Sequence, residues 1–346
     1  MSSFYSGFAT GNREFTTFIY IATVVAFFAF YFAFWKMYLK NKLKAKDVKL
    51  VVGITCAILL FSYPAMLSYD IFNYIFSAKV LFYYHENPYL IMPVQFLGDP
   101  FLSFTHAANK IALYGPSWII ASGLPYILGF GNFILTILNL KLLVVFFYLA
   151  TSWMIYKISK DLLPVILFSL NPLVIVETLV SGHNDIVMVF LALCGIFLLS
   201  RKKVFSSFIF LILSILIKYS TLFLLPVFLY VSFLQKNKKS INWSKIYSFC
   251  AVLMMTAFFL SPIREEIYPW YAIWFLPFAV LQKNRLVLYI SISFSLSLLF
   301  RYVPFMFLGI HDGPAPITKM LVTFVPPLIV LFWYLLSKKL WKWKLM

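Results

Sequence analysis

An aspartate near the start of the chain is the first residue whose setting suggests chemistry. In MLSYDIFNYIF, residues 66–76, Asp70 separates a long apolar run from an aromatic stretch. Aspartate is a common N-cap of helices, so one interpretation is structural. The other is a general base, because desolvation near an apolar interface raises the pKa of a carboxyl and makes it a better base for a hydroxyl group. Both roles can hold at once.

A tight polar turn is the second candidate. In VETLVSGHNDIVM, residues 176–188, Gly182 permits the turn and Asp185 is suited to cap the next helix. Capping does not explain three further polar residues of this segment, Glu177, His183 and Asn184. They predict a hydrogen-bonding surface for a polar ligand such as a sugar. A metal site is disfavoured, because one histidine with irregularly spaced carboxylates is not a typical ligand set.

Several cations lie among apolar residues. Lys218, in LSILIKYSTLFLLP, is either a lysine that snorkels to the membrane surface or a point charge for a phosphate. Lys141 lies roughly 12 Å inside its apolar segment, where a charge needs an ion-pair partner or a function such as phosphate binding. Arg264 and Arg301 lie at the ends of apolar segments. Several cations around one cavity would suit an anionic lipid head group.

An aromatic cluster occurs in REEIYPWYAIWFLP, residues 264–277, and includes Trp270 and Tyr271. Aromatic residues are ordinary at membrane interfaces. The alternative is that these rings stack on a sugar or an isoprenoid.

The segment that begins at Asp70 predicts a helix. Polar residues recur at i, i+3, i+4 and i+7, which makes Asn73 a further candidate contact, and the apolar residues take the opposite face. This pattern predicts an amphipathic helix in the membrane interface. A second segment, SWIIASGLPYILGF, follows Tyr114-Gly115-Pro116 and is too short to span. It predicts an interfacial or re-entrant helix within an outer loop over residues 70–132.

The composition requires an integral membrane protein. Of the 346 residues, 63% are hydrophobic and only 12% are charged, more apolar surface than a soluble domain could bury. The apolar runs can cross a core of about 30 Å, and no β-barrel alternation occurs, so the spans must be helices. We predict a single polytopic all-α domain over residues 1–346, with about eleven transmembrane helices: 16–35, 50–67, 133–156, 162–179, 186–200, 204–217, 221–235, 246–262, 270–282, 286–301 and 317–336.

The charges assign a side of the membrane to each connector. The net charge is +18, and 21 of the 29 lysine and arginine residues lie in alternate connectors and the tail. This positive-inside pattern predicts a cytoplasmic C-terminus and an outer N-terminus, and it argues against nucleic acid as a partner. Most acidic residues and all four histidines fall on the other side. The working surface is therefore expected on the outer face.

The order of the motifs resembles that of a known family. The motifs are Asp70, Asn87-Pro88-Tyr89, Tyr114-Gly115-Pro116, Asn171-Pro172, Gly182-His183-Asn184-Asp185, Lys218 and Pro269-Trp270-Tyr271. This order resembles the GT-C superfamily of polytopic glycosyltransferases, and in particular the polyprenol-phosphate-mannose-dependent α-mannosyltransferases of prokaryotic envelopes. The resemblance covers most of residues 60–285.

The resemblance implies a reaction and roles for residues. A hexose, mannose by analogy, would pass from a polyprenyl phosphate to a hydroxyl of a glycan or glycolipid on the outer face of the plasma membrane. Asp70 would be the base of an inverting transfer, although relatives carry an arginine or second acid beside it where this chain has Tyr69 and Ile71. The expected sugar contacts are Asn73, Tyr114, Glu177, His183, Asn184, Asp185, Trp270 and Tyr271, and the expected phosphate contacts are Lys141, Lys218, Arg264 and Arg301.

No cofactor is expected besides the lipid-linked donor. The chain has no Asp-x-Asp motif, which argues against a divalent metal that bridges phosphate. The alternative function is a transporter or flippase of lipid-linked sugars. Transporters usually place ionisable groups at the midplane, often with inverted repeats, and Lys141 is the feature that favours this alternative.

Overall fold

Every regular element in the described residues, 11–263 and 266–343 of this computed structural model, is a helix. The first part contains α2 (Arg13–Leu39), α3 (Ala45–Leu60), η1 (Pro64–Met66), α4 (Asp70–Phe82), η2 (Pro93–Gln95), η3 (Leu102–Phe104), α5 (Pro116–Ile127) and α6 (Phe133–Ser159). The middle contains α7 (Leu162–Ser169), α8 (Pro172–Val174), η4 (Ile175–Val180), α9 (Asp185–Ser200), α10 (Val204–Ile215), η5 (Tyr219–Leu224) and α11 (Leu225–Lys236). The last part contains α12 (Trp243–Leu260), η6 (Ser261–Ile263), η7 (Pro269–Trp274), α13 (Leu276–Leu281), α14 (Arg285–Phe300), α15 (Val303–Leu308) and α16 (Ala315–Trp343).

The predicted helical class is confirmed for these residues, but the count of about eleven spans is not. Six helical segments are long and apolar enough to cross a membrane, or seven if the bent pair α7 and α8–η4 is one span. The remaining apolar helices are shorter. The 12 residues of α10, for example, rise only about 18 Å at 1.5 Å per residue. The apolar pattern identifies these helices correctly, but it does not reveal where each one breaks.

Asparagine and aspartate side chains begin many of the helices. Asn12, Asn132, Asn242 and Asn284 each accept a hydrogen bond from a backbone N–H in the first turn of the helix that follows. Asp161 does the same for α7. These caps satisfy donors that a helix start leaves unpaired.

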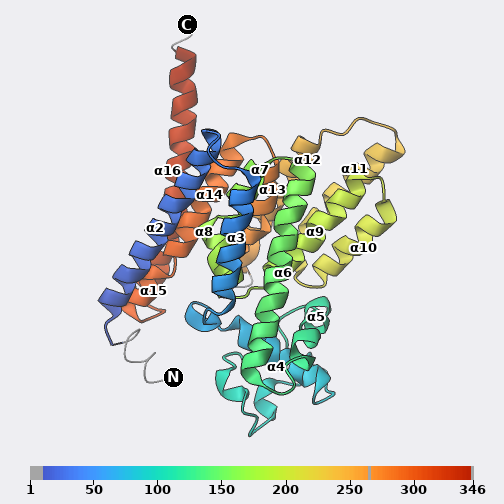
Figure 1. Ribbon diagram of the computed structural model, residues 1–346, viewed down its shortest axis with the longest axis vertical. Helices are drawn as coiled ribbons and strands as arrows, with labels where there is room; N and C mark the ends of the chain where they lie inside the picture. Colours follow the sequence, from blue (N-terminus) through green and yellow to red (C-terminus); the bar gives the residue numbers. More distant parts are fainter. Residues whose placement is uncertain (1–10, 264–265, 344–346) are drawn as a thin grey trace.

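The helices form a bundle with a smaller helical region at one end (Figure 1). The bundle leaves large apolar side chains exposed, among them Phe18 of α2, Phe146 of α6 and Trp333 of α16. Such a surface is expected where a helix faces lipid. The region that contains α4 and α5 lies at the end of the bundle where α2 begins, opposite the C-terminal end of α16 (Figure 1).

Helix α4 forms where the sequence predicts it but is not an interfacial helix with a free apolar face. Nine of its 13 residues are buried, including Ile71, Phe72 and Tyr74. The apolar face packs on protein, because α5, α6 and η2 all contact this helix. Helix α5 differs, since Ile120 and Leu124 are 63% and 59% exposed. That face is apolar as an interfacial or re-entrant helix would require.

A bend in the span after α6 carries polar residues into the bundle. Helix α7 and the segment Pro172–Val180 meet at 55°. Pro172 has no backbone N–H to continue the helix, and Asn171 caps the new one by accepting a hydrogen bond from the N–H of Leu173. The following turn, η4, is π-helical, a rare form that is frequent at functional sites. It leads directly into the Gly-His-Asn-Asp turn.

Candidate active site

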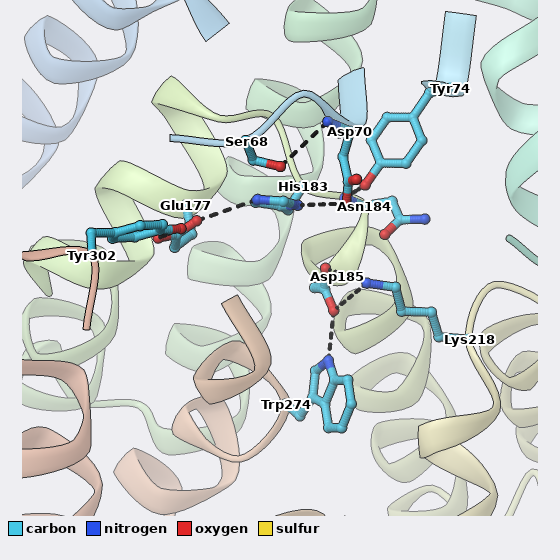
Figure 2. A network of polar contacts seen from close by, with 10 residues as sticks. All are labelled: Ser68, Asp70, Tyr74, Glu177, His183, Asn184, Asp185, Lys218, Trp274 and Tyr302. Atoms are coloured by element: carbon cyan, nitrogen blue, oxygen red, sulfur yellow. Dashed lines mark hydrogen bonds and ion pairs between the residues drawn. The ribbon is translucent and has the colours of Figure 1, made fainter. Parts of the chain in front are cut away.

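Three of the predicted residues form a row at the junction of α4 with the bundle (Figure 2). Nδ1 of His183 lies 3.5 Å from Oδ2 of Asp70, and Nε2 of His183 lies 3.3 Å from Oε2 of Glu177. His183 and Glu177 are fully buried, whereas the side chain of Asp70 is 23% exposed. Asp70 is therefore the end of the row that a substrate can reach.

A second polar group lies beside this row and includes Asp185 and Lys218 (Figure 2). Nζ of Lys218 lies 2.9 and 2.8 Å from the two carboxylate oxygens of Asp185, and Nε1 of Trp274 donates to Oδ1 of Asp185 at 2.6 Å. Asp185 is fully buried, but the side chain of Lys218 is 17% exposed. The predicted capping role of Asp185 is wrong, because its carboxylate is taken by these partners and no side chain caps α9.

Asp70 is the first residue of α4 rather than its cap. Tyr69 occupies the cap position, and no side-chain capping bond is formed. The backbone N–H of Asp70 donates to Ser68 Oγ at 3.3 Å, while its carboxylate faces His183. The capping interpretation is therefore wrong. An acidic side chain is nevertheless favourable in a first turn because of the helix dipole.

Two glycines bring the separate parts of the site together. Gly182 has φ +76°, and a Cβ at this position would meet Cδ1 of Ile71 at 3.2 Å, so the turn of His183 packs closely on α4. At Gly115 a Cβ would lie 2.0 Å from the carbonyl oxygen of Leu216. The Gly115 N–H also donates to the Ile217 carbonyl at 3.1 Å. This contact holds the residue before Lys218 against the start of α5.

The electrostatics of Asp70 correct the sequence prediction. Burial raises its pKa, as expected near an apolar interface, but His183 and Lys218 more than offset it and hold the pKa below the ordinary value. For His183, burial lowers the pKa, but the carboxylates of Asp70 and Glu177 raise it to about 9. At neutral pH the site thus contains an ionised Asp70 beside a cationic His183.

The aromatic cluster lies against the polar residues. The ring of Trp270 stacks on His183 with centroids 3.9 Å apart, and the ring of Tyr268 stacks on Trp270 with centroids 4.5 Å apart. The ring of Tyr271 lies 5.6 Å from Nζ of Lys218 and stacks on Trp274 at 4.1 Å. These buried rings form a wall of the site rather than a belt at a lipid interface.

Asn184 has the most informative environment of the predicted sugar contacts. Its side chain is fully buried, and neither its amide nitrogen nor its amide oxygen has a hydrogen-bond partner among the described residues. Its backbone N–H donates to the Tyr74 hydroxyl at 3.4 Å. A buried amide without partners is costly and points to a ligand that supplies them.

Asn73 lies nearby in α4, and Tyr114 lies just before α5. The side-chain oxygen of Asn73 accepts from the N–H of Ala107 at 3.3 Å. Burial and the neighbouring Asp70 carboxylate raise the pKa of Tyr114, whose ring packs on Tyr74 at 4.5 Å. Tyr114 is therefore next to Asp70, whereas Asn73 is partly engaged by the loop.

Most of the other predicted phosphate contacts have protein partners. Nζ of Lys141 donates to the carbonyls of Leu59 and Ser62 and to Ser62 Oγ, at 2.6, 2.7 and 2.7 Å. These contacts use all three N–H donors of the ammonium group. None of the acceptors is a carboxylate, so the predicted ion pair is not formed among the described residues. Arg301 donates to Glu266, Thr323 and the Ile267 carbonyl. Arg264 lies outside the described residues.

Trp274 and Tyr302 belong to the network, although neither was predicted as a site residue. Trp274 donates to Asp185, and the hydroxyl of Tyr302 donates to Oε1 of Glu177 at 3.0 Å. Trp274 follows Trp270 by four residues in the same aromatic segment, which was a usable signal. Tyr302 carried none, because its relation to Glu177 arises only from the packing of α15 on the bundle.

Comparison with known proteins identifies a family for this chain. The sequence model of the MptA_B family, described as "Alpha-(1->6)-mannopyranosyltransferase, N-terminal domain", matches residues 4–234. The match includes Asp70, the turn of His183 and Lys218, whereas Trp270 lies beyond it. No curated protein and no solved structure matches the chain. The chain belongs to this mannosyltransferase family, and it is a membrane glycosyltransferase.

Proposed function

We propose that the chain transfers a mannosyl group from a polyprenyl phosphate to an acceptor hydroxyl on the outer face of the plasma membrane, with inversion. The observation that carries the proposal is the position of Asp70, an ionised and partly exposed carboxylate that faces His183, the residue directly before the buried, unpaired amide of Asn184. A sugar transfer requires a base for the acceptor hydroxyl and polar groups that can bind the hydroxyls of the sugar.

In the proposed step, Asp70 accepts the proton of the acceptor hydroxyl. The acceptor oxygen then forms a bond to the anomeric carbon, and the bond from that carbon to the phosphate oxygen breaks. The lipid phosphate leaves with the electron pair. Inversion that yields the α linkage in the family's description requires a β-linked donor. A phosphate needs no protonation to leave, so one base suffices.

Lys218 supports the phosphate in this proposal. Its ammonium is partly exposed, it is close enough to lower the pKa of Asp70, and its bonds to Asp185 fix its position. A fixed cation at the leaving group stabilises the charge that develops there. Because this cation is supplied by the chain and no Asp-x-Asp motif is present, we assign no role to a divalent metal.

The outer location rests on the distribution of charge. The lysine-rich connectors mark the cytoplasmic side under the positive-inside rule, which puts α4, α5 and the site outside and the C-terminus inside. A transporter or flippase is no longer the favoured alternative, because the family is enzymatic and the feature that supported it, Lys141, has structural partners.

The test is a transfer assay with the Asp70→Asn variant. Membranes receive a labelled mannosyl polyprenyl phosphate, with octyl α-mannoside as acceptor. The variant keeps the shape of the side chain but cannot accept the proton, so transfer should fall at least about 100-fold. Asp312→Asn, at an exposed aspartate away from the site, is the matched control. A folded Asp70→Asn enzyme with the normal rate refutes the base, and wild-type transfer from a nucleotide sugar alone refutes the donor.

A further inference from the structure

His183 occupies an unusual position for a residue expected to bind sugar. It has no exposed surface, and each ring nitrogen faces a carboxylate oxygen, at 3.5 Å on Asp70 and at 3.3 Å on Glu177. Its ring is stacked on Trp270 with an angle of 20° between the planes. A substrate cannot reach His183 without displacing Asp70 or Trp270.

The two carboxylates determine the charge of this histidine. A neutral imidazole has one N–H donor, whereas the imidazolium has two. Only the imidazolium can donate toward both Asp70 and Glu177, which agrees with a pKa raised to about 9. A neutral ring would leave one nitrogen lone pair facing a buried carboxylate.

The side of His183 that faces away from Asp70 also has close contacts. Glu177 is fully buried and accepts a hydrogen bond from the Tyr302 hydroxyl at 3.0 Å (Figure 2). Trp270 is itself stacked on Tyr268, with only 5° between the ring planes. The ring of His183 is therefore confined by Trp270 on its face and by a carboxylate oxygen near each nitrogen.

We infer that His183 is a positioning residue, an imidazolium anchored by Glu177, Tyr302 and Trp270 that holds the Asp70 carboxylate ionised and aimed at the acceptor. The inference rests on the proposed function, because it assigns the base to Asp70. It replaces the sugar-contact role expected for Glu177 and His183, which lie behind the base.

The consequence is a specific dependence on pH. The titratable groups that face Asp70 and His183 come from α4, η4 and α9 and from the turns before α5, η5 and α15. They are Tyr74, Glu177, Asp185, Tyr114, Lys218 and Tyr302. Without the imidazolium, burial of Asp70 would be opposed chiefly by Lys218, so its pKa would rise. The base would then be protonated at a pH where the wild type is active.

The experiment is the pH profile of kcat/KM for His183→Asn in the same transfer assay. The acid limb should move to higher pH by about one unit or more, so the rate at a pH below the limb should be lower by about tenfold or more. His106→Asn is the matched control, because His106 is an exposed histidine of the outer region that stacks on Tyr69. A folded His183→Asn enzyme whose acid limb coincides with that of the wild type overturns the inference.

A second variant applies if His183→Asn does not fold. In Glu177→Gln one of the two carboxylates that raise the pKa of His183 is lost, so the imidazolium that orients Asp70 should lose its proton at a lower pH. The alkaline limb of the activity profile, expected near pH 9 in the wild type, should therefore move to lower pH. An unchanged alkaline limb contradicts the inference. The activity of Asp70→Asn separates the two proposals. If that variant is active, the proposed base is refuted. If it is inactive while the pH profiles of His183→Asn and Glu177→Gln match that of the wild type, only the positioning role is refuted.

Discussion

The side chain of Asn184 is buried without hydrogen-bond partners among the described residues. Its amide is fully buried, and within the described residues neither polar atom is hydrogen-bonded. Asn171, also fully buried, donates to Ser295 Oγ and accepts from the Leu173 N–H. The same residue type thus has a structural role at one position and an unsatisfied one at the other.

We expect opposite effects from alanine at these two positions. Asn184→Ala removes an unpaired polar group, so the free energy of unfolding should stay the same or rise, while transfer should fall about tenfold through one lost contact to the sugar. Asn171→Ala leaves its partners unpaired and should destabilise the protein by about 1–3 kcal/mol. Thermal unfolding in detergent and the transfer assay measure the two effects. Equal destabilisation by both variants would contradict a ligand role for Asn184.

At the scale of elements, Lys141 links two helices rather than binding substrate. It extends from α6 to the last carbonyls of α3, where its positive charge also complements the negative end of the helix dipole. The Leu59 carbonyl also accepts from the backbone N–H and the hydroxyl of Ser62, so Lys141 adds to the pairing at this helix end. The link fixes the end of α3, from which the chain proceeds to η1 and Asp70.

Lys141→Met and Lys218→Met should therefore distinguish a structural lysine from a lysine that binds the donor phosphate. Lys141→Met removes the three hydrogen bonds that Lys141 donates and should lower the free energy of unfolding by about 1–3 kcal/mol, with the donor KM unchanged. Lys218→Met removes the proposed phosphate cation and should raise the donor KM or lower kcat. Calorimetry or thermal shift assays, together with initial rates, distinguish them. A raised donor KM in a fully stable Lys141→Met enzyme would restore that residue as a phosphate contact.

The bend in the span formed by α7, α8 and η4 determines where Glu177 points. A straight α-helix from Leu162 to Val180 would direct its side chains around a regular cylinder. The break at Asn171-Pro172 and the π-helical turn instead direct Glu177 toward His183 and Tyr302. The positioning of Asp70 thus depends on a helix that is not regular.

At the scale of the whole molecule, the charge asymmetry predicts an orientation. Ser103 is exposed in the segment between α4 and α5, and Lys238 is exposed in a lysine-rich connector. In a background without Cys56, Cys194 and Cys250, a membrane-impermeant maleimide should label Ser103→Cys in intact cells. It should label Lys238→Cys only after permeabilisation. The reverse pattern would place the site on the cytoplasmic face and contradict the proposed use of an outer-leaflet donor.

The sequence by itself determined the class of the molecule and most members of its site. Apolar runs report helices in lipid directly, because burial of the backbone in a membrane leaves few alternatives. The order of short polar motifs indicated the family, and Asp70, His183, Asp185 and Lys218 were all candidates before the structure placed them in adjoining networks.

Only the tertiary structure decided what each polar group does. The pKa of Asp70 is lowered rather than raised, Lys141 joins two helices, and His183 lies behind the base, because each of these depends on which turns meet in the folded bundle. Periodicity is a local property that a sequence reveals, whereas the capping roles expected for Asp70 and Asp185 did not hold in the structure. Pairing between Asp70 and His183 requires a bent span, Gly182 with positive φ and a helix packed against it, which are properties of three dimensions.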